Sequence, residues 1–452
     1  MADVIVIGGG LAGLAAAAAL GGAGHSVRVF ESRPYLGGRA TSYEAGSETI
    51  DNCQHILLGC CVNLLDFYER LGVGDDIKFY REYVLIEPGG RRSLLRAGIF
   101  PAPLHFTGSL LALKFLDWSE KLAVIRGMLA IRREYSLRDD LERISMQQWL
   151  EEKHQPPRAI ERFWRQVLVS AISEELDRMA AIHAFQVFRL GFMARSDAFD
   201  MGVPAVPLGR LYRAEAWNKI GKVDIRLRAP IERIVFENRE NVEVPPAGRQ
   251  DVAMGDTRVR CVIAGGHEHR ADHYICAVPF ERLAAIGVDV DVDGFEYSPI
   301  TGIHLWFDRR VIDIPQATMF DRTIQWVFDK GGGKYVQVVV SASRSLIEMP
   351  RADVIALAVR ELAEFFPAVA QAKLEKAHVV KEVRAVFSPL PGLESRRPPT
   401  LTATCNLFLA GDWTRCGWPA TMEAAVRSGY LAAEAVSEAA GAPQKFLLPD
   451  IA

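Results

Sequence analysis

Long uncharged apolar runs are missing from this chain of 452 residues. A membrane-spanning helix needs about 18 to 20 consecutive apolar residues, and no stretch of the sequence reaches that length. Runs of lysine and arginine are missing too, and the formal net charge is −3, so the chain has no general attraction for nucleic acid. The composition therefore predicts neither a membrane-spanning protein nor a nucleic-acid-binding protein.

Cysteine is scarce as well, with seven residues that form neither a C-x-x-C pair nor a zinc-ligand spacing. An odd number without such spacing suits reduced thiols in the cytoplasm, so we expect no disulfide bonds and no metal site. The N-terminal apolar run lacks the basic leader of a signal peptide, and we expect it to remain on the mature protein.

A glycine-rich turn connects the first apolar strand, residues 4–7, to an alanine-rich helix. Gly8 permits the tight turn, Gly10 lets the backbone approach a phosphate, and Gly13 lets helix and strand pack closely. The helix N-terminus adds amides and the positive end of its dipole. This arrangement indicates dinucleotide binding rather than an ordinary turn. The predicted pyrophosphate contacts are Gly8, Gly10, Leu11, Ala12 and Gly13.

A second strand, residues 26–30, ends in Glu31. Its carboxylate follows the last glycine at about the interval expected of a residue that binds ribose hydroxyls. The next turn contains Gly38 and Arg39, which a plain nicotinamide domain does not need. We expect Arg39 to pair with the pyrophosphate, and a solvated arginine on a surface turn is the alternative. The further predicted cofactor contacts are Glu31, Ser32, Arg33, Gly38 and Arg39.

The far end of the chain repeats the pattern of strand, glycine turn and helix. Residues 407–410 predict a buried strand, and the Asp412 carboxylate that follows can accept hydrogen bonds from ribityl hydroxyls. Pro419 stands where a helix can start, and that helix would direct its amides at the O2 side of a flavin. An ordinary strand-to-helix connection capped by Asp412 is the alternative. The predicted contacts at the flavin end are Gly411, Asp412, Ala420, Thr421 and Met422.

These segments carry a family resemblance that covers nearly the whole chain. The resemblance to the flavin amine oxidase and phytoene desaturase superfamily lies in VIVIGGGLAGL, ESRPYLGGRATS and LFLAGDWT with PATMEAAVRSG. It implies non-covalently bound FAD, with Ile234 and Val235 near the adenine and Ala277 at the end of a nucleotide-domain strand. It also implies an α/β fold, in which a Rossmann-like FAD-binding domain of the glutathione-reductase type is interleaved with an α+β substrate domain.

The periodicity of the chain agrees with such interleaving. We expect an FAD-binding domain in three parts, 1–93, 205–285 and 386–452, a helical insert at 94–204, and a substrate-domain sheet and helix at 286–385. Predicted helices are 157–173, 174–192 and 354–366. Predicted strands are 231–236, 258–264, 273–278, 303–307, 323–328 and 335–342. Predicted turns are a hairpin near 88–90, which ends the first nucleotide-domain part, and a hairpin loop at 238–255.

A narrower resemblance lies in residues 51–60, DNCQHILLGC, which are similar to the DNGQHxLLGC signature of the hydroxysqualene dehydroxylases. Cys53 and the segment 415–418 depart from the family pattern. The resemblance implies that reduced FAD replaces the allylic hydroxyl of hydroxysqualene by hydrogen, which gives squalene. A reductive reaction makes NADPH the expected external reductant.

This reaction needs an acid beside the leaving hydroxyl. His55 is the predicted acid because its ordinary pKa lies near neutral pH, and Asp51 is its predicted orienting partner or an alternative acid. The alternative is that both side chains only tie their loop to the flavin.

A long isoprenoid substrate needs an apolar tunnel. The predicted lining is Gln54, Trp306, Trp326, Phe328 and Trp418, although we expect most aromatic residues of the chain to be core residues. Two other functions stay open at this stage. One is an FAD-dependent desaturase or oxidase acting on a carotenoid or an amine, and the other is a flavin-loaded lipid carrier or scaffold among squalene-making enzymes, without turnover.

Residues 99–133 form an apolar and aromatic segment that ends in a basic helix. Arg126, Arg132 and Arg133 lie on a helix composed otherwise mainly of Leu, Ile, Val and Ala. This combination suits peripheral contact with anionic lipid on the inner face of the cytoplasmic membrane. Core packing within a substrate domain explains the same pattern equally well.

Overall fold

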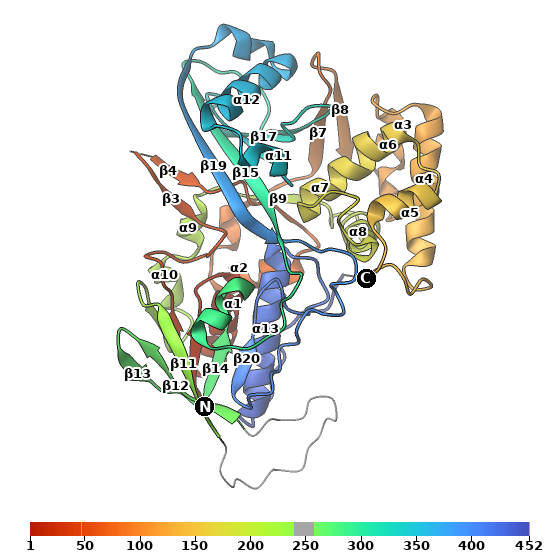
Figure 1. Cartoon of the computed structure of the whole chain (residues 1–452). Coiled ribbons are helices and arrows are strands. Elements are labelled where there is room, and N and C mark those ends of the chain that lie inside the picture. The colour runs from red at the N-terminus through yellow and green to blue at the C-terminus, as the bar shows by residue number, and fades with distance from the viewer. Residues whose placement is uncertain (47, 239–256, 452) are drawn as a thin grey trace.

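The structure is a computed structural model that describes residues 1–46, 48–238 and 257–451. A parallel five-stranded sheet, in the order β10-β2-β1-β14-β20, lies in the lower half of Figure 1. Its strands are short and mainly apolar because a parallel sheet covered on both faces buries the side chains of both. The strands are β1 (Asp3–Ile7), β2 (Ser26–Phe30), β10 (Val223–Arg226), β14 (His273–Cys276) and β20 (Leu407–Leu409).

Helices α1 (Leu11–Gly22) and α13 (Met422–Ala439) cover one face of this sheet. A Cβ atom at Gly429 would lie 2.2 Å from the carbonyl oxygen of Ala12, so glycine permits the two helices to pack closely. A small antiparallel sheet packs on the other face, formed by β11 (Ile231–Asn238), β12 (Thr257–Ala264) and β13 (His267–His269).

A larger, seven-stranded sheet occupies the upper part of Figure 1, in the order β19-β15-β18-β17-β16-β7-β8. Ile303, Leu305 and Phe307 pack against the helix α12, and the alternating position of His304 places its side chain on the opposite side. The elements are β7 (Glu82–Ile86), β8 (Arg92–Arg96), β15 (Tyr297–Phe307), β16 (Gln316–Met319), β17 (Trp326–Gly331), β18 (Tyr335–Val340), β19 (Leu374–Phe387), α11 (Arg344–Ile347) and α12 (Arg351–Phe365).

A helical insert packs beside the large sheet, on the right of Figure 1. Its core contains Trp149, Trp164, Phe185 and Phe188, all fully buried. Among the described residues, no helix is both long enough and apolar enough to cross a membrane. The helices are α3 (Thr107–Ala112), α4 (Trp118–Glu134), α5 (Met146–Glu152), α6 (Pro157–Ala159), α7 (Gln166–Ile172) and α8 (Ala181–Gln186), with π-helical turns at Ile160–Arg165 and Val187–Met193.

Short elements connect these layers. Strand β9 follows the insert and pairs with β5 and β6, which precede it in the sequence. The short elements are β3 (Ser42–Ala45), β4 (Glu48–Asp51), β5 (Leu57–Leu58), α2 (Val62–Arg70), β6 (Ile77–Tyr80), β9 (Met201–Pro204), α9 (Leu208–Leu211) and α10 (Ala214–Trp217).

The predicted α/β class is confirmed, and three predicted elements differ in detail. The hairpin near 88–90 is present, but it belongs to the large sheet because β7 pairs in parallel with β16. The helix predicted at 174–192 begins only at Ala181, since Ser173 adopts a left-handed φ of 60° and the buried Glu174 pairs with Arg344. The strand predicted at 323–328 starts at Trp326. The loop predicted at 238–255 lies outside the described residues from 239 onward.

Candidate active site

The glycine turn after β1 has the geometry of a phosphate-binding loop. Gly8 adopts a φ of +110°, and a Cβ atom there would lie 2.7 Å from the carbonyl oxygen of Ala277. A Cβ atom at Gly13 would lie 2.0 Å from the Gly8 oxygen. Gly10 is open by contrast, since the nearest atom to a Cβ there is 3.9 Å away. Among the described residues no side chain caps the N-terminus of α1, so its first amides remain available for an anion.

Glu31 stabilises the same turn through its buried carboxylate. Its Oε2 accepts a hydrogen bond from the Gly9 amide at 2.7 Å, and its Oε1 accepts one from the Arg33 amide at 2.7 Å. Ser32 Oγ donates to the same Oε1 at 3.1 Å. Glu31 therefore fixes the shape of the loop, and its contact with a ribose hydroxyl stays a prediction.

The two predicted adenine-side residues lie on β11. Ile234 shares a hydrophobic cluster with Phe30, the residue that precedes Glu31. Val235 is half-buried on the same strand. Their position beside the end of β2 is compatible with an adenine site, which stays a prediction.

The opening and closing segments of the chain meet at an ion pair. The Gly37 amide donates to the Gly9 oxygen at 2.9 Å, which holds the second glycine turn against the first. Arg39 extends from the second turn, and its Nη2 lies 2.5 Å from Asp412 Oδ1. Arg39 thus pairs with the carboxylate that was predicted to bind ribityl hydroxyls. The contact shows that both glycine turns and Asp412 belong to one site.

The closing helix starts later than predicted. Helix α13 begins at Met422 instead of Pro419, because Thr421 is its N-cap and its hydroxyl accepts a hydrogen bond from the Ala424 amide at 3.2 Å. The cap satisfies one amide, and the remaining amides of the first turn keep the positive end of the helix dipole directed toward the Asp412 side of the site.

Two aromatic residues of the closing segment lie in separate cores. Trp418 packs with Cys60 and Cys416 and donates from Nε1 to Asp450 at 2.9 Å. Trp413 packs in the nucleotide-domain core, so the two tryptophans belong to different clusters. Burial raises the pKa of the Cys416 thiol, which disfavours the thiolate that a covalent flavin bond would need.

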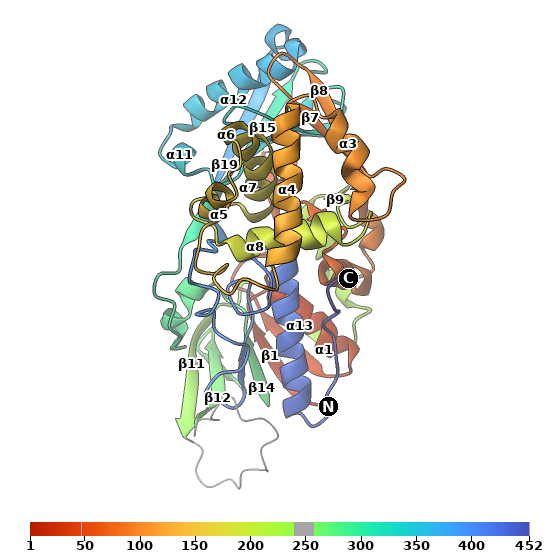
Figure 2. The same ribbon diagram turned by 90° about the vertical axis from the view of Figure 1, so that its right-hand side faces the viewer.

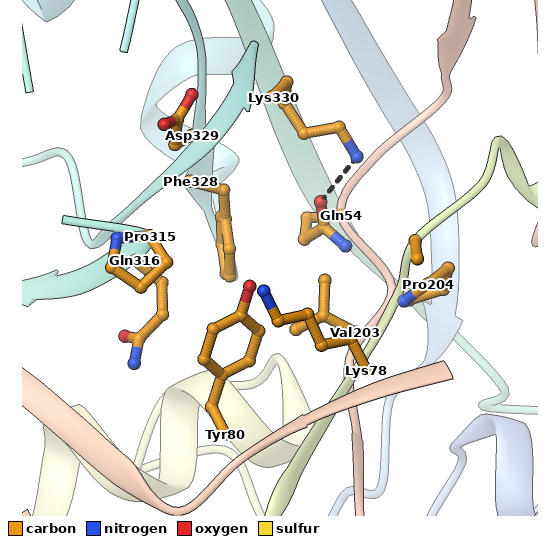
Figure 3. A pocket seen from close by; sticks show the side chains of 11 residues that line it. Gln54, Lys78, Tyr80, Val203, Pro204, Pro315, Gln316, Phe328, Asp329 and Lys330 are labelled. Carbon is orange, nitrogen blue, oxygen red and sulfur yellow. Dashed lines mark hydrogen bonds between the residues drawn. The ribbon is translucent and has the colours of Figure 1, made fainter. Parts of the chain in front are cut away.

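Asp51 lies at the end of β4 with its carboxylate buried, and it is bonded from three sides. Its Oδ1 accepts hydrogen bonds from Ser42 Oγ at 2.7 Å and from the Leu208 amide at 2.9 Å. Its Oδ2 lies 3.3 Å from Lys330 Nζ. The same ammonium donates to Gln54 Oε1 at 3.1 Å (Figure 3). The predicted site residues Asp51 and Gln54 therefore meet at a cation that the sequence analysis missed.

A signal for Lys330 exists in the strand pattern. Trp326, Phe328 and Lys330 alternate along β17, so the strand period places a charge on the face that carries two large aromatic side chains. Figure 3 shows Asp329 on the other side of the strand, where its carboxylate accepts hydrogen bonds from the amides of the following turn. The identity of the partner of Lys330 could not be predicted, because Asp51 is 279 residues away.

His55 has a different partner from the one predicted. Its Nε2 lies 3.1 Å from Oδ1 of Asn52, not from Asp51. The amide nitrogen of Asn52 donates to the Arg39 oxygen at 2.7 Å, so the Asn52 oxygen faces His55 and accepts the Nε2 proton. Burial is the main cause that lowers the pKa of His55 to about 4. The negative charge of Asp51 opposes this shift, and the positive charges of Arg39 and Lys330 add to it. The imidazole is therefore neutral at pH 7, which disfavours it as a stored acid.

Two of the predicted tunnel residues lie together. Trp326 and Phe328 stack at 5.6 Å between ring centroids, in a buried cluster with Cys53, Phe199 and Met201. We call the side of β17 that carries Trp326, Phe328 and Lys330 the Trp326 face. It is apolar at Trp326 and polar at Lys330. A substrate with a long hydrocarbon chain and one polar group would match this gradient.

Trp306 does not join that cluster. It lies on β15 and stacks on Tyr335 at 4.4 Å between ring centroids, with the Lys376 ammonium 4.6 Å from its ring. Its side chain is half-buried at the polar end of the sheet.

A cavity of about 150 Å³ adjoins the polar end of the Trp326 face. Gln54, Phe328 and Lys330 line one side of it (Figure 3). The opposite side is formed by Lys78, Tyr80 and Val203 from β6 and β9. The described residues contain no group of three or more metal-ligating side chains that could hold a metal ion.

Comparison with known proteins shows the family of this chain. The model of the family described as flavin containing amine oxidoreductase matches residues 11–437. The chain belongs to this family. It is an FAD-dependent oxidoreductase, and the broader of the two resemblances in the sequence is confirmed.

The curated relatives include carotenoid desaturases. A 15-cis-phytoene desaturase of Synechococcus elongatus is 25% identical over 468 residues, which cover 96% of this chain and 95% of the relative. A protein of the same organism described as a probable zeta-carotene desaturase is 24% identical over 486 residues, which cover 96% of this chain and 98% of the relative.

The similar solved structures show the fold alone, since their sequences are distant. An oxidoreductase from Methanosarcina mazei has a TM-score of 0.69 at 17% identity, covering 94% of this chain and 98% of the other. A putrescine oxidase bound to putrescine has a TM-score of 0.67 at 17% identity, covering 97% of this chain and 99% of the other.

The geometry of the site fits FAD. The open side of Gly10 and the uncapped N-terminus of α1 suit a pyrophosphate, with Arg39 as a nearby cation. The N-terminus of α13 suits the O2 side of an isoalloxazine ring. Asp412 and Glu31 lie on these two sides, and their contacts with hydroxyl groups of the cofactor stay predictions.

Proposed function

We propose that the protein catalyses the FAD-dependent reductive dehydroxylation of hydroxysqualene to squalene. The observation that carries the proposal is the contact of Lys330 with Asp51 and Gln54 at the polar end of the Trp326 face. Asp51 and Gln54 belong to the segment that resembles the hydroxysqualene dehydroxylases. A long apolar substrate with one hydroxyl group matches both the apolar face and its polar end.

The charges at this end of the site favour a hydroxyl over other groups. A pure hydrocarbon gains nothing from the half-buried ammonium of Lys330, and covering this charge costs free energy of desolvation. A protonated amine would be repelled by Lys330, and the Asp51 carboxylate that could attract it is already paired. A hydroxyl oxygen can accept a hydrogen bond from the ammonium without losing the pair.

The reaction exchanges a C–O bond for a C–H bond. The allylic carbon receives a hydride, and the hydroxyl takes up one proton and leaves as water. FAD, when bound in its reduced form, supplies the hydride. In this proposal Lys330 Nζ donates the proton to the leaving oxygen, and the resulting amine regains a proton from solvent. Asp51 holds Nζ in place, and the aromatic pair Trp326 and Phe328 excludes water from the apolar chain. NADPH is the proposed external reductant.

Carotenoid desaturation is the second candidate, because the relatives named phytoene desaturase and zeta-carotene desaturase match nearly the whole chain. It uses oxidised FAD as the acceptor of hydride, so the two candidates differ in the direction of electron flow. The apolar side of β17 suits either substrate. The contact of Lys330 with Asp51 and Gln54 favours only hydroxysqualene, the substrate that carries a hydroxyl group.

The redox state of the cofactor separates the two candidates experimentally. Purified protein is incubated without oxygen, once after photoreduction and once oxidised, with hydroxysqualene, phytoene or a polyamine, and products are identified by mass. We expect squalene only from reduced protein with hydroxysqualene. Desaturated product from oxidised protein with phytoene would establish the second candidate instead. A flavin that no substrate oxidises or reduces would leave only the carrier function.

A further inference from the structure

Exposed large hydrophobic side chains are concentrated in one segment of the chain. Nine of the sixteen such residues in the described chain lie between positions 94 and 137. Single exposed apolar residues are normal on soluble proteins, but a contiguous patch marks a contact surface.

Helix α4 of the insert is apolar on two faces. Val124 and Ile131 are fully buried in the core of the insert. Trp118, Leu122 and Leu129 are 65%, 57% and 61% exposed, and their spacing of four and seven residues places them on one stripe. Core packing therefore explains one face of the helix, and the other face has no apolar partner among the described residues.

The loop before α3 carries further exposed apolar side chains. Ile99 is 96% exposed, Phe100 54% and Leu104 60%. Lys121 Nζ of α4 donates to the Leu111 oxygen at 2.7 Å, which holds the end of α3 against α4. Both helices lie on the outer side of the insert, at the right in Figure 1 and facing the viewer in Figure 2. We call these residues the insert face: Ile99, Phe100, Leu104, Trp118, Leu122 and Leu129.

The charges around the insert face are almost all positive. The whole chain has a net charge of −3, but between 94 and 133 the exposed charged residues comprise five bases and one acid. The acid, Asp117, caps the N-terminus of α4 through the Glu120 amide. The bases are Arg96, Lys114, Arg126, Arg132 and Arg133.

We propose that the insert face binds the surface of an anionic lipid bilayer. An apolar stripe with a tryptophan, flanked by arginines, inserts its side chains among the lipid chains and places its charges at the headgroups. A second copy of the chain is disfavoured, because a symmetric dimer would bring two positively charged faces together. The proposal does not depend on the proposed reaction, since lipid binding is measured without turnover.

Vesicle co-sedimentation of the FAD-loaded protein tests the proposal. We expect strong binding to vesicles that contain phosphatidylglycerol and weak binding to pure phosphatidylcholine, with the difference lost at high salt. The variant W118S/L122S/L129S should bind the anionic vesicles at least about tenfold more weakly, because three inserting side chains are removed. The variant R126Q/R132Q/R133Q should bind both vesicle types equally weakly.

A matched control removes three exposed apolar residues elsewhere. L227S/V383S/L401S should bind vesicles as the unaltered protein does, and circular dichroism checks that every variant is folded. The proposal is overturned if the unaltered protein does not sediment with anionic vesicles, or if W118S/L122S/L129S binds them equally well. A dimer in sedimentation velocity that only W118S/L122S/L129S abolishes, without vesicle binding, would assign the face to a second copy.

Discussion

The ammonium of Lys330 lies 3.3 Å from the carboxylate of Asp51, across 279 residues of sequence. Asp51 is also bonded to Ser42 and to the Leu208 amide, so its position is fixed independently of the lysine. Lys330 in turn follows Trp326 and Phe328 on one face of β17. This pair therefore sets a charged, rigid end to a buried apolar cluster, and the proposed chemistry depends on it.

Replacing Lys330 by Met tests whether the lysine ammonium takes part in the reaction. We expect K330M to lower kcat for hydroxysqualene about 100-fold or more, because a positioned proton donor is lost. The flavin-to-protein absorbance ratio should be unchanged, since Lys330 touches none of the proposed FAD contacts. K334M, on the exposed turn after β17, is the matched control and should keep full activity.

A double variant tests whether the loss is only structural. K330M leaves the buried Asp51 without its cation and should lower the thermal midpoint, while K330M/D51N should restore it because no buried charge remains. We expect activity to stay low in the double variant. Recovery of kcat together with stability would assign Lys330 a structural role and remove it as the proton donor.

His55 should contribute little as an acid, because its pKa of about 4 leaves it neutral at pH 7. We expect turnover by the unaltered protein to stay level from pH 8 to pH 6, and H55Q to retain it within about threefold. Steady-state rates across this range check the prediction. His55 would again be the candidate acid if the rate of the unaltered protein rose about tenfold per pH unit on acidification and the rate of H55Q did not.

The buried His304 should make the fold sensitive to acid. Burial lowers its pKa to about 4, while an unfolded histidine titrates near 6.5. The unfolded chain therefore binds the proton first, and stability falls as the pH drops from about 6.5 toward 4. The expected loss from this residue between pH 7.5 and 5 is about 2 kcal/mol.

The thermal midpoint of H304Q should accordingly depend less on pH than that of the unaltered protein. His55 and His183 shift in the same direction, so part of the dependence will remain. H267Q, at an exposed position, is the control and should keep the full dependence. An H304Q curve that parallels the unaltered protein would contradict the prediction.

Two glycines of α1 offer a matched test of the FAD loop. In G13A the new Cβ would lie 2.0 Å from the backbone oxygen of Gly8, which cannot move without distorting the turn. We expect loss of bound FAD and a destabilisation of about 1–3 kcal/mol. A Cβ atom at Gly22 would meet nothing within 4 Å, so G22A should keep its FAD. Normal FAD content in G13A would argue against this loop as the pyrophosphate site.

Local signals in the sequence predicted much of the nucleotide domain. The strands β1 and β2, the glycine turn and α1 follow from patterns within 30 residues, because turn geometry and helix packing constrain each glycine directly. The hairpin near 88–90 shows the limit of such signals. Its turn was predicted from adjacent residues, but its place in the large sheet depends on pairing with β16, more than 200 residues later.

The sequence by itself determined the cofactor class, through two glycine turns and the closing strand and helix. Only the tertiary structure decided what surrounds the proposed reaction. It paired Asp51 with Lys330 and His55 with Asn52, and it left one apolar face of α4 exposed while burying the other. The physical reason is that a phosphate-binding turn is a property of neighbouring residues, whereas burial, ion pairing and pKa shifts arise between segments that only folding brings together.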